Sequence, residues 1–323
     1  MRKLFLALLV SIASLVAGAA PSLAAGYAFD RQQDVIYGRK FGTALTMDVF
    51  TPKEKPNGAG VILVMSGGWV SSKDQIQPIF VFDMMKRGYT VFAVVHGSQP
   101  KFTIPEMVAD LHRAVRYIRT NADDFQIDPN RIGISGASAG GHLSLMMGCA
   151  GETGNPKAKD PVDRASSRVQ AVACFFPPTD FLNYGKMGEK VLGIEPNHQF
   201  KAPFDFHEQE AGSKLFKPVD LETREKICKE ISPIYHVTKD DAPVLIIHGD
   251  ADELVPLQQS EIIIDRLKEA GVPAELIVKK GGGHGWATIL ADFVTLGDWF
   301  DKYLPAPSAA KAEAQAAAKP AAE

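Results

Sequence analysis

The chain has few cysteines and therefore little basis for a disulfide framework. Only three occur in 323 residues, at positions 149, 174 and 228, and an odd number leaves at least one thiol unpaired. Cys149 and Cys174 stand in apolar segments with the patterns of a core helix and a core strand. Because free cysteine is among the residues most often buried, we expect buried thiols and no essential disulfide.

The chain also lacks a marked excess of charge of either sign. It carries 35 Lys and Arg residues against 38 Asp and Glu residues, which gives a formal net charge of −3. Nucleic acids and anionic membrane surfaces attract proteins with a strong basic excess. The composition therefore indicates no nucleic-acid partner.

The N-terminal apolar run, Leu4 to Val16, is short for a bilayer span, which takes about 20 residues. It follows Arg2-Lys3 and precedes small residues that end in Ala24-Ala25, the order of a secretory signal peptide. We predict that residues 1–25 are a cleaved signal peptide and that the protein is secreted or periplasmic. After cleavage we expect no stable membrane insertion. The alternative is that the segment remains as a membrane anchor.

Strand-like and helix-like segments alternate along the rest of the chain, after a hairpin pattern over residues 34–50. Such alternation is typical of an α/β fold with a mostly parallel sheet and helices on both faces. Ligands bind such sheets at the carboxyl ends of the strands. The buried-strand patterns cover residues 60–68, 89–97, 131–136, 169–176, 242–250 and 274–280, and the helical patterns cover 104–121, 142–150, 258–270 and 289–303.

These segments predict one domain, residues 26–304, with one long interruption. Residues 180–236 separate two core strands by more than a crossover needs, and they hold several aromatic residues. Because loops of this length are usually functional, we interpret them as a helical cap over the site; the alternative is a peripheral excursion. Residues 305–323 repeat Ala, Pro, Lys and Glu and predict a disordered tail.

Ser138 lies in the sequence "GASAG", residues 136–140, directly between a strand pattern and a helix pattern. This is the setting of a nucleophile elbow, in which the serine adopts a strained backbone conformation and its hydroxyl projects above the sheet. Small neighbours are needed there, and the glycines and alanines on either side provide them. Ser138 is therefore the candidate nucleophile.

A serine nucleophile needs a base and a carboxylate that orients it. His284 stands in "GGGHGW" after the last strand pattern, and Asp250 and Asp252 stand in "HGDADELVP" after the preceding one. We assign His284 as the base and favour Asp252 over Asp250, which we expect to cap the turn. The remaining candidates, His96, His142 and His248, are interpreted as structural or supporting residues.

An oxyanion needs backbone N–H donors opposite the nucleophile. We assign one to Ala139, directly after the serine. The others are assigned to Gly67 and Gly68 in "MSGGW", where a strand pattern ends, and Trp69 is expected to line the substrate pocket. The alternative for the two glycines is an ordinary turn.

Together these motifs resemble the α/β-hydrolase fold, and specifically the esterase/lipase branch with acetylxylan-esterase-like and carboxylesterase-like enzymes. The resemblance covers about residues 34–304 and includes "GASAGGH", "HGDADELVP" and "GGGHGW". It departs at "MSGGW": Met65 stands where that branch has a histidine, and Ser66 stands where it has its first glycine. The resemblance implies ester hydrolysis through an acyl-enzyme, with no metal and no organic cofactor.

We therefore predict a secreted serine hydrolase that cleaves carboxylic esters, with short acyl groups or acetylated polysaccharide as substrates. A peptidase of the prolyl-oligopeptidase type is one alternative, although no propeller-like repeat domain precedes the first core strand. A non-catalytic binding protein on the same fold is another, although such proteins usually lose a member of the Ser, Asp, His set. The sequence assigns no oligomeric state.

Overall fold

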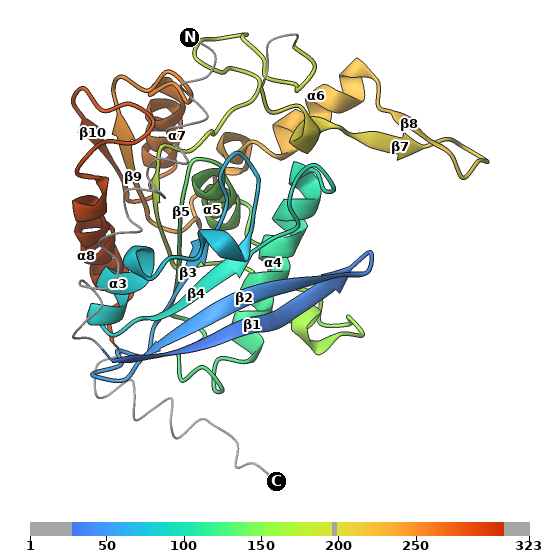
Figure 1. The fold of residues 1–323 in the computed structure, drawn as a ribbon. Helices are drawn as coiled ribbons and strands as arrows, with labels where there is room; N and C mark the ends of the chain where they lie inside the picture. Colours follow the sequence, from blue (N-terminus) through green and yellow to red (C-terminus); the bar gives the residue numbers. More distant parts are fainter. Residues whose placement is uncertain (1–27, 196–198, 307–323) are drawn as a thin grey trace.

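A computed structural model describes residues 28–195 and 199–306 (Figure 1). The predicted signal peptide and all but the first two residues of the predicted tail lie outside these described residues. Within the described ranges, no helix is both long and apolar enough to cross a membrane.

The core is an eight-stranded sheet with the order β1-β2-β4-β3-β5-β6-β9-β10. The pairs β1–β2 and β2–β4 are antiparallel, and every later pair is parallel, so the predicted mostly parallel sheet is confirmed. The strands are β1 (Phe29–Lys40), β2 (Thr43–Pro52), β3 (Gly60–Val64), β4 (Thr90–Val95), β5 (Ile132–Ala137), β6 (Ala171–Phe175), β9 (Val244–Gly249) and β10 (Ala274–Lys279).

Helices cover both faces of this sheet, as the alternating pattern predicts (Figure 1). On one face α3 (Pro78–Lys86) and α8 (Phe293–Tyr303) pack over one apolar cluster. On the other face α4, α5 and α7 pack over a second cluster, with bounds Ile104–Thr120, Ala139–Cys149 and Gln258–Glu269. Short 3-10 turns complete the body at Lys73–Gln75, Pro161–Arg164 and Ile289–Asp292.

The order of the strands determines where the predicted site residues lie. The chain runs from β3 to β4 on one side and later returns to β5 on the other side of β3. Such a reversal leaves a crevice outside the carboxyl ends of the two strands. The segment Met65–Trp69 leaves β3 at this point, and Ser138 leaves β5 beside it.

The insertion at residues 180–236 differs from the predicted helical cap. Its described part contains one α-helix, α6 (Leu221–Glu230), and a two-stranded hairpin of β7 (His207–Gln209) and β8 (Phe216–Pro218) that projects from the body (Figure 1). The rest is irregular apart from two 3-10 turns, Ala202–Phe204 and Pro233–His236. Aromatic residues attach most of this segment to the core: Phe181, Phe204 and Phe206 are buried, and Phe204 packs on both of the others. The helix α6 adds the buried Cys228.

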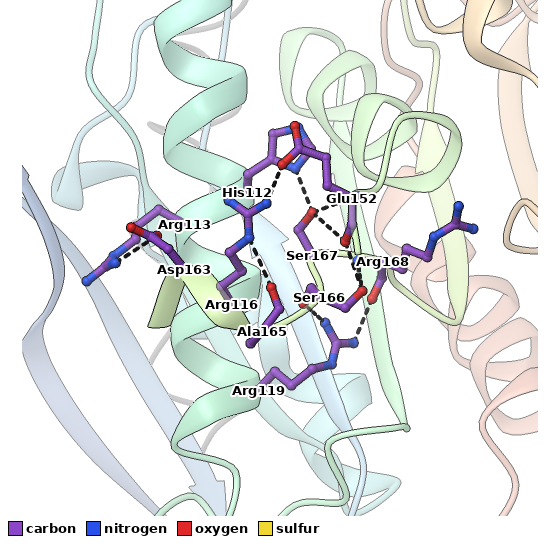
Figure 2. Close-up of polar contacts among 10 residues, drawn as sticks. All are labelled: His112, Arg113, Arg116, Arg119, Glu152, Asp163, Ala165, Ser166, Ser167 and Arg168. Carbon is purple, nitrogen blue, oxygen red and sulfur yellow. Dashed lines mark hydrogen bonds and ion pairs between the residues drawn. The ribbon is translucent and has the colours of Figure 1, made fainter. Parts of the chain in front are cut away.

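The loop between α5 and β6 is fastened to α4 by long polar side chains (Figure 2). Arg116 Nε donates to the carbonyl of Ala165 at 3.1 Å, and Arg119 Nη2 donates to that of Arg168 at 2.6 Å. One turn earlier on α4, His112 Nδ1 lies 2.8 Å from the hydroxyl of buried Ser167. These contacts supply the hydrogen bonds that an irregular segment cannot make by itself.

The three cysteines are free, buried thiols in the structure. Cys149 ends α5, Cys174 lies in β6 and Cys228 lies in α6. Burial raises the pKa of the Cys174 thiol above its ordinary value. A neutral buried thiol behaves as a small apolar side chain in packing.

Candidate active site

Ser138 occupies a strained turn between β5 and α5. Its backbone angles are φ 55° and ψ −120°, a conformation that costs a non-glycine residue about 1–3 kcal/mol. A Cβ at Gly136 would lie 2.5 Å from the backbone of Gly140, and a Cβ at Gly140 would lie 2.7 Å from the carbonyl oxygen of Val64. The two glycines are therefore required by close packing around the turn.

The structure brings Ser138, His284 and Asp252 together from three strand ends. His284 Nε2 lies 2.9 Å from Ser138 Oγ, and His284 Nδ1 lies 2.7 Å from Asp252 Oδ2. Because a carboxylate only accepts, Nδ1 carries the proton and Nε2 accepts from the hydroxyl of Ser138. This is the tautomer in which an imidazole can take a proton from serine.

Phe176 fixes the ring of His284 from one side. The two ring centroids are 4.4 Å apart. Phe176 follows β6 directly, so it rises from the same edge of the sheet as the serine turn. Sequence reasoning missed this residue; its position after a buried strand was the available signal.

Asp252 is held as a carboxylate by several donors. Its Oδ1 accepts from the amides of Leu254 and Val255 at 2.9 Å each, and its Oδ2 lies 3.3 Å from His248 Nε2. Burial alone raises the pKa of Asp252, but hydrogen bonds from His248, His284 and the Val255 amide outweigh it and lower that pKa well below its usual range. The group facing His284 is therefore negatively charged at neutral pH.

Asp250 has a separate place, as the sequence interpretation expects. It is exposed, and its Oδ1 accepts from the amide of Gly281 at 2.6 Å. That bond ties the end of β9 to the glycine loop that carries His284. Asp250 therefore caps a turn, whereas Asp252 contacts the histidine.

The three predicted oxyanion donors, Gly67, Gly68 and Ala139, differ in position and in whether their N–H groups already have an acceptor. Gly68 lines the cavity beside Ser138. Ala139 is the first residue of α5, where an amide has no acceptor within the helix. The amide of Gly67 instead donates to the carbonyl of Val70 at 3.0 Å, in a small two-way pairing with that residue. The assignment of Gly67 as a donor is therefore corrected, because its N–H is already engaged.

Trp69 lines the same cavity and is held from behind by His142. Its Nε1 donates to His142 Nδ1 at 3.2 Å, while His142 Nε2 donates to the carbonyl of Ile231 at 2.7 Å. Burial lowers the pKa of His142 to about 4, so this imidazole is neutral at pH 7 and keeps an acceptor for the indole. His142 is thus a support for the pocket wall.

The cavity beside Ser138 is small and mostly apolar. Its volume is about 30 Å³. The phenol of Tyr184 in its wall donates to the carbonyl of Leu254 at 3.0 Å and is thereby engaged. The wall consists of Gly68, Trp69, Ser138, Pro178, Phe181, Tyr184, Val191, Phe200, Leu254 and Val255.

Four of these wall residues come from the irregular insertion, which therefore lies against the site despite containing little helix. Phe200 packs on Trp69 with ring centroids 5.8 Å apart. A Cβ at Gly68 would lie 2.5 Å from the Phe200 ring, so the two elements are in close contact. The aromatic content of the insertion was the only sequence signal for this wall.

No group of three or more His, Cys, Asp or Glu side chains with a metal-binding arrangement occurs among the residues that the structure describes.

The fold and this arrangement define the class: the protein is an α/β-hydrolase, with a serine, a histidine and an aspartate at the carboxyl edge of its sheet. The family follows from the sequence. The model of the BD-FAE family matches residues 47–267, which is more than half of the chain, and the chain belongs to that family.

Named relatives are esterases. The chain is 26% identical to Esterase LipC of Mycobacterium tuberculosis, over 78% of this chain and 59% of that protein. It is 26% identical to the probable carboxylic ester hydrolase LipM of the same organism, over 73% of this chain and 51% of that protein. The chain thus spans little more than half the length of these relatives.

A solved structure, the truncated form of a carbohydrate esterase from gut microbiota, is similar to this chain with a TM-score of 0.67 and 28% identity. The match covers 85% of this chain and 97% of that one.

Proposed function

We propose that the protein is a serine esterase that cleaves short-chain carboxylic esters. The observation that carries this proposal is the hydrogen-bonded series from Ser138 through His284 to Asp252. Its first member, Ser138, lines a cavity. Esterases among the relatives support the same activity.

In the proposed mechanism Ser138 Oγ attacks the ester carbonyl while His284 Nε2 takes its proton. Asp252 holds the imidazole in the required tautomer and stabilises the positive charge that develops on it. His284 then gives the proton to the leaving alcohol, and an acyl-enzyme remains on Ser138. Water activated by His284 attacks this acyl group, and the carboxylic acid leaves as the proton returns to the serine.

The oxyanion of each tetrahedral intermediate is proposed to lie between the amides of Gly68 and Ala139. Gly68 comes from the loop after β3, and Ala139 is at the N-terminus of α5, where the helix dipole favours negative charge. The amide of Gly67 is left out because it donates to Val70.

The cavity supports a short, uncharged acyl group. At about 30 Å³, it has room for an acetyl or similar group, since one water needs roughly 10–15 Å³ on this scale. Among the residues that the structure describes, the wall offers no charged side chain to pair with a second carboxylate on the acyl group. Similarity to a carbohydrate esterase makes an acetylated polysaccharide the proposed natural source of such esters.

Secretion remains part of this proposal, because a polysaccharide substrate lies outside the cytoplasm. It rests on the N-terminal sequence, in which Arg2-Lys3 precedes an apolar run and small residues. N-terminal sequencing of the protein from the expressing cell, with a start near residue 26, would support it; a start at Met1 would count against it.

Activity on p-nitrophenyl acetate, butyrate and octanoate, together with acetate release from acetylated xylan, tests the proposal. We expect turnover that falls steeply with acyl length and disappears in Ser138→Ala. Labelling of Ser138 by a fluorophosphonate should accompany it. Binding of acetylated xylan without any ester turnover or labelling would instead favour a non-catalytic binding protein.

A further inference from the structure

The segment Met65–Trp69 brings Gly68 and Trp69 to the cavity, but it has almost no regular structure of its own. It lies beside the segment His96–Gln99, which follows β4. The amide of Met65 donates to the carbonyl of Val94 at 3.0 Å and begins the contact between the two segments. The side chain of Met65 is buried among apolar residues and offers no strong hydrogen bond to the loop.

Ser66 and His96 form the first side-chain link between these segments. His96 Nδ1 lies 2.8 Å from the carbonyl of Gly97, and His96 Nε2 lies 2.8 Å from Ser66 Oγ. Since a carbonyl only accepts, Nδ1 carries the proton and Nε2 accepts from the Ser66 hydroxyl. Burial lowers the pKa of His96 to about 4, against the weaker opposing effect of the Gly97 carbonyl, so the ring keeps this acceptor at pH 7.

Ser71 adds a second link on the same side. Its hydroxyl donates to the carbonyl of Met65 at 2.5 Å and accepts from the amide of His96 at 3.1 Å. Position 66 is therefore flanked by one bond through its own side chain and one through the preceding carbonyl. The first bond ends on the His96 ring, and the second reaches the His96 amide through the Ser71 hydroxyl.

Gln99 links the part of the loop nearest the cavity. Its Nε2 donates to the carbonyl of Gly68 at 2.5 Å, and its amide donates to the carbonyl of Trp69 at 3.2 Å. In a trans peptide the C=O and the following N–H point in opposite directions. The bond to Gly68 therefore turns the N–H of Trp69 away from Gln99 and holds the peptide that follows Gly68. The peptide before Gly68, which carries the proposed donor N–H, is held by the amide of Val70, which donates to the carbonyl of Gly67 at 3.0 Å. Gln99 thus holds Gly68 from its C-terminal side.

The supporting segment is itself anchored. The amide of Gly97 donates to Asp110 Oδ2 at 2.8 Å, and the same oxygen pairs with Lys40 Nζ at 2.6 Å. Asp110 is buried on α4. A rigid helix thus fixes His96–Gln99, and that segment in turn fixes the loop after β3.

We propose that His96, acting through Ser66, and Gln99, acting through Gly68, are positioning residues for the oxyanion-binding loop. This proposal rests on the esterase function proposed above. In this proposal neither side chain touches the ester; each holds the segment that carries the N–H of Gly68, the donor proposed to meet the developing oxyanion. Because an oxyanion hole must be in place before the charge forms, loosening the loop should reduce kcat with little change in KM.

The central comparison uses variants that separate positioning from packing. Ser66→Ala removes the donor, and His96→Ala removes the acceptor together with most of the ring. His96→Gln keeps an amide oxygen near the position of Nε2 and is the conservative rescue. His112→Ala is the matched control, because it deletes another buried histidine that bonds a serine, but one on α4 away from the cavity.

We expect Ser66→Ala and His96→Ala to lower kcat for p-nitrophenyl acetate by about 10- to 100-fold, since small misplacements at a site can cost about 100-fold. Affinity for a trifluoromethyl ketone, which forms an oxyanion on the serine, should fall in parallel. Gln99→Ala should act in the same direction. His96→Gln should recover part of the loss, and His112→Ala should keep kcat per folded molecule.

Two results would overturn the proposal while leaving the esterase function intact. One is an active wild type in which Ser66→Ala and His96→Ala keep both kcat and trifluoromethyl-ketone affinity. The other is a loss that His112→Ala reproduces at an equal decrease in Tm. An inactive wild type would overturn the proposed function itself, so the activity of the wild type is measured before the variants are compared.

Discussion

Two serines in this molecule each contact a histidine that has a carboxylate nearby. Their surroundings differ in the geometry of the histidine, in access to the serine and in backbone strain. Ser138 bonds His284, which bonds Asp252, and Ser138 lines a cavity. Ser167 bonds His112, and Glu152 lies beside both, with its amide on Ser167 and its carboxylate near the other ring nitrogen of His112 (Figure 2). We call the latter three residues the Ser167 cluster.

The two arrangements differ first in the geometry of the histidine. His284 uses Nε2 for the serine and Nδ1 for Asp252 at 2.7 Å. His112 uses Nδ1 for Ser167, and its Nε2 is 3.9 Å from Glu152 Oε1. That distance is too long for a hydrogen bond, and Glu152 also pairs with Arg116.

They differ also in access and strain. Ser167 is fully buried, and its hydroxyl accepts from the amide of Glu152 at 2.9 Å. Ser138 is partly exposed in a strained turn at a helix N-terminus. A serine and a histidine with a carboxylate nearby therefore occur twice, but of these two arrangements only that of Ser138 has a cavity beside the serine and a strained turn at a helix N-terminus.

The largest expected difference is between two single variants, each of which replaces one of the two serines with alanine. Ser138→Ala should lower kcat by at least about 10⁴-fold, because removing a serine nucleophile has effects of this size or larger. Ser167→Ala should leave kcat per folded molecule unchanged. Initial rates on p-nitrophenyl acetate, normalised to the folded fraction by circular dichroism, provide the measurement; equal losses would mean that the comparison is wrong.

The carboxylates give the next largest effect. Asp252→Asn should lower kcat by about 10³- to 10⁴-fold, since an amide there favours the wrong imidazole tautomer. Asp250→Asn is the matched control two residues away and should keep most of the activity, because Asp250 only caps the Gly281 turn. Loss of turnover in the Asp250 variant alone would reverse the assignment.

Ser167→Ala should show its effect in stability. It removes a buried hydroxyl that bonds His112 and the Glu152 amide, and unpaired buried partners cost about 1–3 kcal/mol. Urea unfolding should therefore show a lower free energy of unfolding with an unchanged slope. A stability equal to that of the wild type would indicate that the Ser167 cluster contributes nothing to the fold.

A further effect, spread over several pH units, is a change in how stability depends on pH. Burial lowers the pKa of His112 to about 4, an effect that Glu152 partly opposes, whereas an unfolded histidine has a pKa near 6.5. Between these values the unfolded chain binds more protons, so His112 contributes stability above pH 6.5 that is lost as the pH falls toward 4.

His112→Asn removes this contribution. The slope of unfolding free energy against pH should decrease between pH 4 and 6.5 by up to about 1.4 kcal/mol per pH unit. Denaturation curves at several pH values measure it, with Asp250→Asn as a surface control. Parallel pH profiles for the variant and the wild type would contradict the assigned direction.

The sequence predicts Ser138, Asp252 and His284 because each has a local signature. Each follows a strand pattern in a loop with glycine or another turn residue, and parallel strands bring their carboxyl ends to one edge. The sheet itself is predictable for the same reason, since β6 and most of β9 are continuous apolar runs and β5 is rich in small and apolar residues. Long-range geometry then follows from topology without knowledge of side-chain packing.

Other parts depend on contacts that sequence spacing does not encode. The amide of Gly67 is engaged by Val70 through the detailed course of one loop. The insertion at 180–236 touches the cavity through scattered aromatic residues such as Phe200, so helical periodicity is the wrong signal for it. The meeting of Ser66 with His96 requires two loops from neighbouring strands to lie in register.

The burial of α5 has a consequence for how the protein loses activity. All eleven of its residues are buried, and the helix starts at the strained turn of Ser138. That strain has no local route of release, because the helix would have to leave the sheet first, and such a core element opens only with the whole domain. Thermal inactivation should therefore be as cooperative as unfolding itself, with no partly folded species that keeps its tertiary structure but has a relaxed, inactive serine turn.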